Sequence, residues 1–251
     1  MDELLLRLRR GEIQGLNVTI PHKQSVLARL DGLGPAAQAI GAVSVIYRQG
    51  ERLVGENMDA PGFITALQSF WQDAYSRNLP GASQMAQALI LGAGGSARAV
   101  AYALLLAGWH VTLASRRVEQ AAEIVLDLQV ATSGQQRLQA VELSAAGIAG
   151  LLHGIDLLVN TTPLGMWPAV ETTPWPVELA LPANAAVYDL VYNPSQTALV
   201  RLARLAGLLA ASGSGMLIEQ AILAFELWTG VPASRDTMSH ALAEIMEGAE
   251  S

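Results

Sequence analysis

The stretch that decides the fold spans residues 88–116 and reads ALILGAGGSARAVAYALLLAGWHVTLASR. An apolar strand, a glycine turn, a helix and a second strand follow one another within about 30 residues, which is the size of a βαβ unit. Gly92, Gly94 and Ala97 fit the pattern G-x-G-x-x-G/A, whose first glycine allows a tight turn and whose second lets a pyrophosphate approach the backbone. The helix behind the turn offers N–H groups and a positive dipole to phosphate. We therefore expect a dinucleotide site here; the alternative is a structural turn that binds nothing.

The end of the second strand indicates which dinucleotide binds. An acid at this point bonds the ribose hydroxyls of NAD, whereas an arginine accommodates the 2′-phosphate of NADP. The chain has Ser115, Arg116 and Arg117 here, and no acid before Glu119. Because a guanidinium is a planar fork of donors that suits phosphate, we expect NADP rather than NAD. The alternative is two solvated arginines at a helix start, where the dipole makes cations mildly unfavourable.

Composition excludes several classes of protein. The 251 residues are 51% hydrophobic, enough to bury a large core, and the net charge of −7 gives no electrostatic footprint for nucleic acid. The first residues are acidic rather than typical of a signal peptide, and no apolar run reaches the roughly 18 residues of a membrane span. The chain has no cysteine, which excludes disulfides, thiolate metal ligands and a cysteine nucleophile. We expect a cytoplasmic protein without nucleic-acid, membrane or metal partners.

The remaining elements fall into two groups. In the front section we expect a helix over 2–10, a strand over 16–20, a helix over 24–32, a hairpin of strands 43–47 and 52–56, and a helix over 60–75 with Asp59 as its N-cap. Residues 79–83 look like a linker. After this linker we expect strands at 88–91, 110–115, 138–143, 156–160 and 185–191. We expect helices at 118–128, 144–153, 197–206, 216–228 and 234–247. Strands that alternate with helices over 88–211 favour an α/β fold with a doubly wound parallel sheet.

Polar residues gather at the strand ends of the front section. Asn17 and Thr19 would point the same way from one strand, and Lys23 and Asp59 each follow a strand or hairpin. A lysine can donate the proton that a developing alkoxide needs, while a carboxylate holds and orients the ammonium. This pair suits carbonyl reduction. The alternative is a solvated lysine and an aspartate that only caps a helix.

Motifs in the same order along nearly the whole chain resemble the shikimate dehydrogenase family. Residues 15–23 resemble its G-x-N-V-T-x-P-x-K, residues 55–63 its G-x-N-T-D-x-x-G-F, and residues 92–99 its G-A-G-G-A-x-x-A. Residues 115–117 fall on the family's N-R-T, residues 160–166 resemble N-[AT]-T-P-x-G-M, and residues 188–197 resemble Y-D-x-x-Y-x-P-x-x-T. The stretches 215–221 and 225–230 resemble the closing signature. A set of ordered motifs is far more specific than any one of them.

The resemblance implies an NADP-dependent oxidoreductase that interconverts 3-dehydroshikimate and shikimate in aromatic amino-acid biosynthesis. It implies Lys23 and Asp59 as the catalytic pair. It implies substrate contacts by Asn17, Thr19, Ser44, Asn57, Tyr192 and Gln220. For the cofactor it implies Gly92, Ala93, Gly94, Gly95, Ser96, Ala97, Ser115, Arg116, Arg117, Thr161, Met166, Val191, Gly213 and Met216.

The family fold implies three parts. Residues 1–82 would form a small α/β substrate-binding domain, residues 83–212 a Rossmann-like NADP-binding domain, and residues 213–251 helices that return to the first domain. A homodimer is an open alternative to a monomer.

Departures from the family leave two further readings open. No counterpart exists for the family's first strand and helix with the S-x-S-P serines that bind the substrate carboxylate, so the chain looks like one that starts late or is truncated. An asparagine of the family is Ser44 here, a threonine is Met58, and Ser115 and Arg117 alter the N-R-T motif. One alternative is a non-catalytic NADP-binding or regulatory relative. The other is an enzyme of the same type that acts on quinate or a similar acid.

Overall fold

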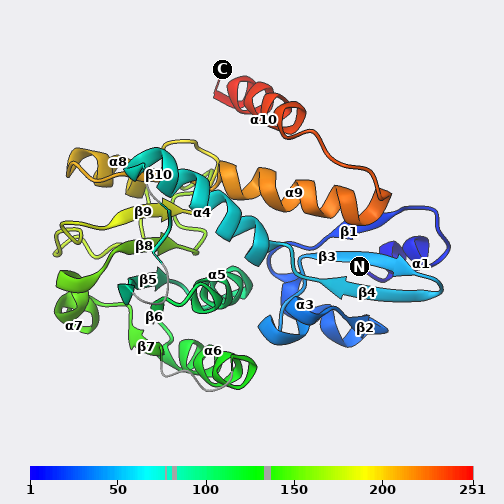
Figure 1. The fold of residues 1–251 in the computed structure, drawn as a ribbon, viewed down its shortest axis with the longest axis horizontal. Coiled ribbons are helices and arrows are strands. Elements are labelled where there is room, and N and C mark those ends of the chain that lie inside the picture. The colour runs from blue at the N-terminus through cyan, green and yellow to red at the C-terminus, as the bar shows by residue number, and fades with distance from the viewer. Residues whose placement is uncertain (77, 81–83, 133–136, 251) are drawn as a thin grey trace.

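The computed structural model describes residues 1–76, 78–80, 84–132 and 137–250, and it contains two sheets beside each other. The larger sheet has six strands and the smaller has four (Figure 1). The expected linker over 79–83 lies partly outside the described residues. The α/β class and the parallel main sheet predicted from the glycine-containing unit are confirmed.

The large sheet is parallel throughout and doubly wound. Its strands are β5 (Gln87–Leu91), β6 (His110–Ser115), β7 (Leu138–Glu142), β8 (Leu157–Asn160), β9 (Ala186–Asp189) and β10 (Ala210–Ser212). They lie in the order β10-β9-β8-β5-β6-β7, in which the chain starts in the middle, runs to one edge and returns to the other side. This is the Rossmann order, and ligands of such sheets bind where the direction reverses, here between β5 and β8.

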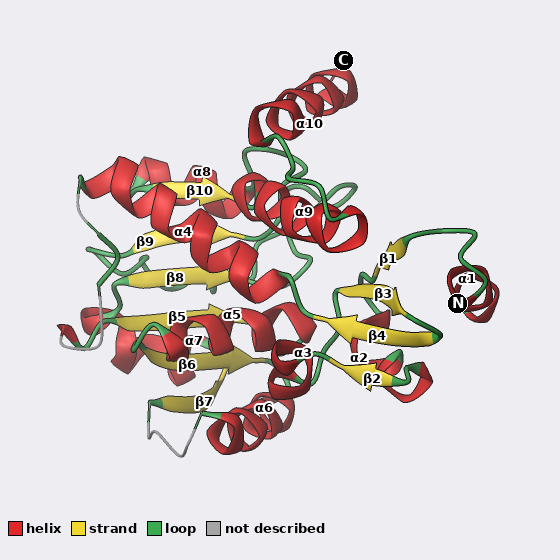
Figure 2. Ribbon diagram, turned by 45° about the vertical axis from the view of Figure 1, so that its right-hand side comes forward, coloured by secondary structure: helices red, strands yellow, loops and turns green. Residues whose placement is uncertain are grey.

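Helices cover both faces of the large sheet (Figure 2). Ala88 and Ile90 of β5 face α4 (Asp59–Tyr75), α5 (Gly95–Leu106) and α6 (Val118–Ala131) in one core. Leu89 and Leu91 face the other core, which contains residues of α7 (Ala145–Ile148) and α8 (Ala198–Leu205). A strand buried on both faces needs apolar residues at every position, which explains the unbroken apolar run at 88–91.

The small sheet carries the amino-terminal part of the chain. Its strands are β1 (Gly15–Asn17), β2 (Gly32–Leu33), β3 (Val45–Gln49) and β4 (Arg52–Glu56), in the order β1-β3-β4-β2. The predicted hairpin is β3 and β4, which turn at Gly50 with a φ of 63°. The helix α1 (Asp2–Arg9) packs Leu5 and Leu8 into the core of this lobe.

Two long helices connect the lobes. The helix α4 leaves the small sheet after β4 and packs against α5 and α9 (Ser214–Thr229). The helix α9 starts after β10 and ends where the Trp228 ring lies on Gly15 of β1, at a distance that leaves no room for a β-carbon on Gly15. The last helix, α10 (Arg235–Glu250), packs on α9, where Arg235 forms an ion pair with Glu219. The carboxy-terminal segment therefore returns to the amino-terminal lobe.

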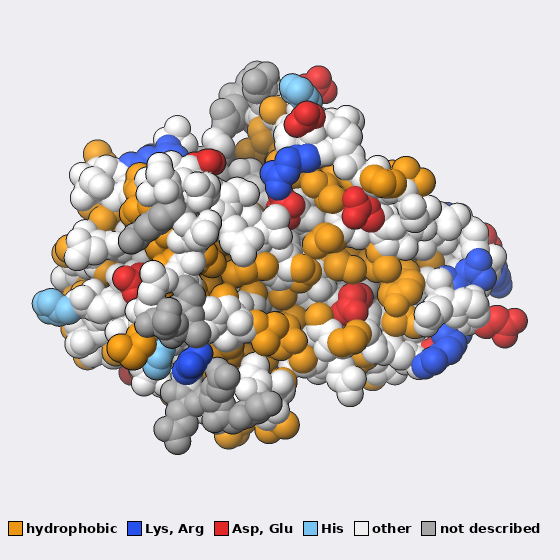
Figure 3. Space-filling model, in the orientation of Figure 1, with side chains coloured by type: hydrophobic (Ala, Val, Ile, Leu, Met, Phe, Trp, Pro, Cys, Tyr) orange, Lys and Arg blue, Asp and Glu red, His pale blue; other side chains and the backbone are white. Residues whose placement is uncertain are grey.

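The surface of the molecule differs in character from its middle to the end formed by the small lobe. Figure 3 shows hydrophobic side chains in the middle of one face, over α4 and α9, and charged side chains at the end formed by the small lobe. Some charges of this lobe form ion pairs, as in Arg9 with Asp31 (2.9 Å) and Arg29 with Asp2 (2.7 Å). No helix in the part of the chain that is described is long and apolar enough to span a membrane.

Several expected elements were wrong in the front section. The expected strand over 16–20 ends at Asn17, and the expected helix over 24–32 is replaced by α2 (His22–Ser25), a 3-10 turn η1 (Leu27–Arg29) and β2. The helix α3 (Pro35–Ile40) was not predicted. Short elements held by packing rather than by periodic pattern give little sequence signal.

In the part of the chain that forms the large sheet, the differences between expected and observed elements are smaller. The expected helix over 144–153 is α7 followed by the 3-10 helix η3 (Ala149–Gly154), and the strand expected at 185–191 is the shorter β9. The short edge strand β10 was not predicted, because its three residues, AAS, lack β-branched and aromatic side chains.

Candidate active site

A cleft of about 1060 Å³ lies between the small lobe and the carboxyl ends of the large sheet's strands. One wall is formed by Ile20, Pro21, Lys23 and Gln24 of the small lobe. The other walls come from the glycine loop and from the residues after β6, β7 and β8. The cleft therefore opens at the point where the order of the strands reverses, which is where a dinucleotide binds in such folds.

The glycine loop has the geometry of a phosphate cradle. Gly92 has a φ of 118°, and a β-carbon there would lie 2.6 Å from Thr161 Oγ1, so only glycine fits. Gly94 has no atom within 4 Å of the position where a β-carbon would stand, so its backbone is open to the cleft. The helix α5 begins at Gly95, and the first N–H groups of a helix have no partner within it. Ala97 is buried behind the loop. The donor set fits a pyrophosphate.

The end of β6 carries the predicted 2′-phosphate site. Ser115 is buried, and its hydroxyl accepts a hydrogen bond from the Arg117 N–H (3.2 Å), which fixes the turn after the strand. Arg116 and Arg117 are exposed and line the cleft. Two guanidinium groups at this end of the cleft fit a dianionic phosphate.

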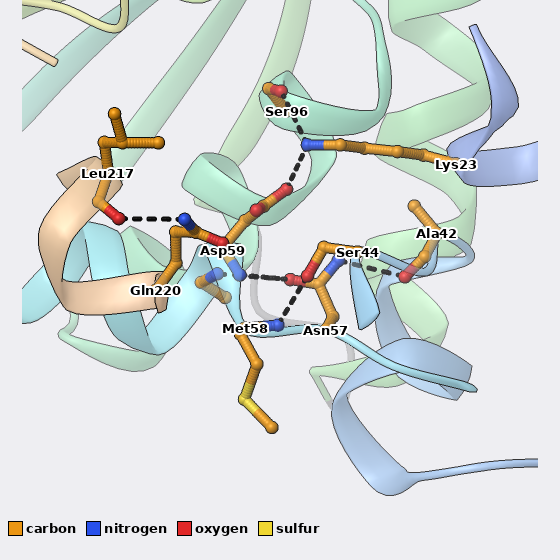
Figure 4. Close-up of polar contacts among 10 residues, drawn as sticks. Lys23, Ala42, Ser44, Asn57, Met58, Asp59, Ser96, Leu217 and Gln220 are labelled. Atoms are coloured by element: carbon orange, nitrogen blue, oxygen red, sulfur yellow. Dashed lines mark hydrogen bonds and ion pairs between the residues drawn. The ribbon is translucent and has the colours of Figure 1, made fainter. Parts of the chain in front are cut away.

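Lys23, which lines the cleft, pairs with Asp59. Lys23 Nζ donates to Asp59 Oδ2 at 2.5 Å and to Ser96 Oγ of the glycine loop at 3.4 Å (Figure 4). The lysine side chain is 13% exposed and the aspartate side chain 6% exposed. The pair joins α2 of the small lobe with the start of α4, and the lysine also lines the cleft. A protonated amine held by a carboxylate next to a dinucleotide loop can donate a proton to a substrate oxygen.

The expectation that Asp59 caps α4 was wrong. Asn57 Oδ1 instead accepts from the N–H groups of Asp59 (3.1 Å) and Ala60 (3.2 Å). Asn57 Nδ2 donates to the Ala42 carbonyl (2.9 Å), so its amide is committed to the backbone. Because the asparagine satisfies the first turn of the helix, the Asp59 carboxylate remains available to Lys23.

Ser44 is also committed to the chain itself. Its hydroxyl is buried and accepts from the Met58 N–H (2.8 Å) (Figure 4). Ser44 and Asn57 thus hold the segment before Asp59 in place. Their expected contacts with substrate hydroxyls stay a prediction.

The other residues expected at the substrate come from three segments. Asn17 ends β1 and Thr19 follows it; both are exposed, while Val18 between them is buried. Gln220 lies on α9, and its backbone N and Cα come within 3.1 Å of the place where a β-carbon on Gly62 would stand. Since Gly62 is one turn after Asp59, this close approach brings Gln220 near the carboxylate. Tyr192 is 39% exposed on the loop after β9.

A buried aspartate that the sequence analysis did not single out organises the loops after β8 and β9. Asp189 accepts from Asn160 Nδ2 (2.8 Å), Thr197 Oγ1 (2.6 Å) and the Val191 N–H (3.0 Å). Asn160 in turn accepts from the N–H and hydroxyl of Thr162. Burial raises the pKa of Asp189 to about 6, although these hydrogen bonds act in the opposite direction. Its only sequence signal is its place in the Y-D motif at 188–189.

This network reaches several of the residues expected to bind the cofactor. Thr161 and Thr162 line the cleft, and Met166 is half-exposed at the end of the same loop. The Gly213 N–H donates to the Val191 carbonyl (3.1 Å), which joins the loop after β9 to the start of α9. Met216 is buried in the main core. Among the described residues, no three His, Asp or Glu side chains are grouped so as to hold a metal ion.

The strand order, the glycine cradle and the adjoining second lobe define a two-lobed α/β protein of the Rossmann type. The model of the shikimate dehydrogenase substrate-binding domain matches residues 1–46, and that of the shikimate 5′-dehydrogenase C-terminal domain matches residues 213–243. The shikimate dehydrogenase (NADP(+)) of Moorella thermoacetica is 41% identical over 243 residues, which cover 96% of this chain and 78% of the relative. The chain belongs to the shikimate dehydrogenase family.

Solved structures agree with this assignment. The shikimate 5-dehydrogenase of Thermus thermophilus, in complex with NADP(H) and shikimate, has a TM-score of 0.79 and 37% identity, with 97% of this chain and 83% of that chain covered. The quinate dehydrogenase of Corynebacterium glutamicum, in complex with NAD, has a TM-score of 0.82 and 30% identity, with 97% and 82% covered.

Proposed function

We propose that this chain is an NADP-dependent shikimate dehydrogenase, which interconverts 3-dehydroshikimate and shikimate. The observation that carries the proposal is the Lys23–Asp59 pair, 2.5 Å apart, beside a glycine loop that fits a dinucleotide. Family membership supports the substrate, and Arg116 and Arg117 at the end of β6 support NADP. In that role the protein takes part in aromatic amino-acid biosynthesis. A cytoplasmic location and a homodimer stay predictions.

Composition supports the assignment of Lys23 independently of the family. Among the 15 lysine and arginine residues of the chain, Lys23 is the only lysine. Everywhere else this protein meets the need for a cation with arginine, whose guanidinium does not lose its proton in proteins. An ammonium can lose its proton, and a reversible proton transfer requires that. The one lysine of the sequence therefore lies at the position where proton transfer is proposed.

The residues divide the chemistry in a simple way. The bound cofactor supplies or accepts a hydride. In the direction of reduction, Lys23 Nζ donates a proton to the oxygen that develops negative charge, and in the direction of oxidation it accepts the hydroxyl proton. Asp59 holds and orients the ammonium. Asn17, Thr19, Gln220 and Tyr192 are proposed to bind the substrate's other hydroxyls, which fixes the ring against the lysine.

The test is NADP⁺ reduction by purified protein with shikimate, followed by absorbance. We expect turnover with shikimate and NADP⁺, and a loss of about 10²–10⁴ in kcat for Lys23→Ala. Folded protein that binds NADP⁺ but does not oxidise shikimate or quinate would contradict the proposal and support a non-catalytic relative. A higher kcat/KM for quinate than for shikimate would contradict the substrate assignment alone.

A further inference from the structure

The first turn of α5 serves the cofactor site and also contacts the small lobe. A β-carbon on Gly95 would lie 3.1 Å from Lys23 Cβ and 3.7 Å from Ala42 Cβ, so the helix start rests directly on both segments. Ser96 Oγ accepts from Lys23 Nζ, which comes from the same lobe. The helix that offers its N-terminus to the pyrophosphate thus touches the lobe that carries the proton donor.

Arg98, the fourth residue of α5, extends this contact. Its side chain is only 8% exposed, and its Nη1 donates to Asp127 Oδ2 of α6 (2.7 Å) and to the Ile40 carbonyl at the end of α3 (3.4 Å). Gly41, which ends α3 in the left-handed conformation, lies against the same guanidinium. A cation suits this place, because the carbonyls at a helix C-terminus carry partial negative charge. Arg98 does not line the cleft.

The contacts continue from Arg98 to the catalytic pair. After Ile40, the Val43 N–H donates to the Lys23 carbonyl (2.8 Å), and the Ala42 carbonyl accepts from Asn57, whose other amide atom holds the start of α4 at Asp59. Lys23 then returns to the glycine loop through Ser96. Hydrogen bonds and packing contacts therefore link α5, whose N-terminus faces the expected cofactor site, to both Lys23 and Asp59.

We propose that the first turn of α5 is a coupling surface that sets the position of the small lobe relative to the cofactor, with Arg98 as its anchor. Arg98 is a positioning residue, since it acts through the segment 40–44 rather than on the substrate. A displacement of about 1 Å between reacting groups can cost about 10²-fold in rate. The inference rests on the proposed function for its effect on turnover, but not for its effect on Lys23.

The kinetic test uses Arg98→Met, which keeps an unbranched apolar stem and removes the guanidinium, with Asp127→Asn as the matched control. We expect Arg98→Met to lower kcat/KM for shikimate at least tenfold while the Kd for NADP⁺ stays within about twofold, and Arg98→Lys to restore part of the loss. Asp127→Asn keeps the bond to Ile40 and should stay within about threefold of the wild type. Unchanged kinetics in Arg98→Met, an equal loss in Asp127→Asn, or a proportional loss of NADP⁺ affinity would each overturn the proposal.

The second test needs no turnover. Because the chain has one lysine, protein labelled with ¹³C at the lysine ε-carbon gives a single lysine ε-carbon NMR signal. We expect NADP⁺ to shift this signal in the wild type and to shift it less in Arg98→Met. If Arg98→Met fails to fold, Ser96→Ala replaces it, and its free protein should already show an altered lysine signal. A lysine signal that does not shift when NADP⁺ is added, or that is the same in the variant as in the wild type, would contradict the coupling. This holds even if shikimate is not the substrate.

Discussion

At the residue scale, a substitution at Lys23 can distinguish a role for its positive charge from a role in proton transfer. Arginine at position 23 keeps the positive charge next to Asp59 but does not give up its proton. We expect Lys23→Arg to fold and bind NADP⁺ as the wild type does, with kcat lower by about 10²-fold or more. Steady-state kinetics together with NADP⁺ titration measure both effects. A kcat within tenfold of the wild type would show that position 23 needs only a charge.

Arg116 and Arg117 allow the cofactor preference to be tested. A charge-assisted hydrogen bond contributes about 1.5–3 kcal/mol, which corresponds to about 10–100-fold in affinity. We expect Arg116→Ala to raise the KM for NADP⁺ by this factor and to leave the KM for NAD⁺ nearly unchanged. Arg117→Ala, assayed in parallel, measures the share of the second guanidinium. Equal effects of Arg116→Ala on both cofactors would contradict a contact with the 2′-phosphate.

Asp189 predicts a pH dependence of stability. Burial raises the pKa of Asp189 from 3.8 to about 6, so the folded state binds a proton more readily than the unfolded state. This carboxyl therefore adds stability at pH values below its unfolded pKa, and that contribution, at most about 3 kcal/mol, is lost as the pH rises through 6.

The measurement compares the free energy of unfolding of the wild type and Asp189→Asn at pH 5 and pH 7.5. The variant has no titrating group at this position, so the wild type should lose more stability than the variant between the two pH values. A difference between the proteins that is the same at both pH values would exclude a raised pKa at Asp189.

The sequence predicted the Lys23–Asp59 pair from two positions at strand ends together with the resemblance to the family; the residues alone left a solvated lysine and a capping aspartate as the alternative. It predicted that the Asp59 side chain caps α4, whereas Asn57 Oδ1 accepts from the first N–H groups of the helix; either residue type caps helices well. Nothing in the sequence indicated that Arg98 is buried, because an arginine in the first turns of a helix is most often solvated. Its burial follows from the packing of α3 on α5.

At the scale of elements, the crossing of α4 and α9 depends on Gly62. A β-carbon there would stand 2.9 Å from the backbone N of Gln220, so the two helices would have to move apart. We expect Gly62→Ala to lower the free energy of unfolding by about 1–3 kcal/mol and to raise the KM for shikimate, because Gln220 moves with α9. Gly150→Ala is the control, since a β-carbon there meets nothing within 4 Å. An equal effect of both substitutions on stability would argue against a close helix crossing.

Periodic elements were the ones that sequence could predict. The glycine unit, the hairpin and the long helices have strong local patterns, and their positions are confirmed within a few residues. The region 22–40 folds into short pieces whose stability comes from the small lobe's core, so no local pattern distinguishes them from one helix. For the same reason the sequence did not predict α3, whose end contacts Arg98.

At the scale of the whole molecule, shared helices predict a single unfolding unit. Since α9 packs on α4 and also contacts Gly15 and β3 of the small lobe, packing around this helix joins the two lobes. We expect one cooperative thermal transition, and NADP⁺ at about 100 times its Kd should stabilise the protein by about 2.7 kcal/mol. Scanning calorimetry with and without NADP⁺ measures this. Two transitions, of which NADP⁺ shifts only one, would show that the lobes unfold independently.

The contact between Trp228 and Gly15 also has a consequence for synthesis. The two residues are 213 positions apart (228 − 15), so the ribosome must complete almost the whole polypeptide before the first lobe receives its last packing partner. Until α9 emerges, Gly15 of β1 lacks the Trp228 ring and α4 lacks the helix that packs on it. Such long-range closure slows folding and leaves the nascent chain open to wrong associations. A stall or a premature stop near residue 212 would therefore release an incompletely packed polypeptide, which is a substrate for chaperones and proteases.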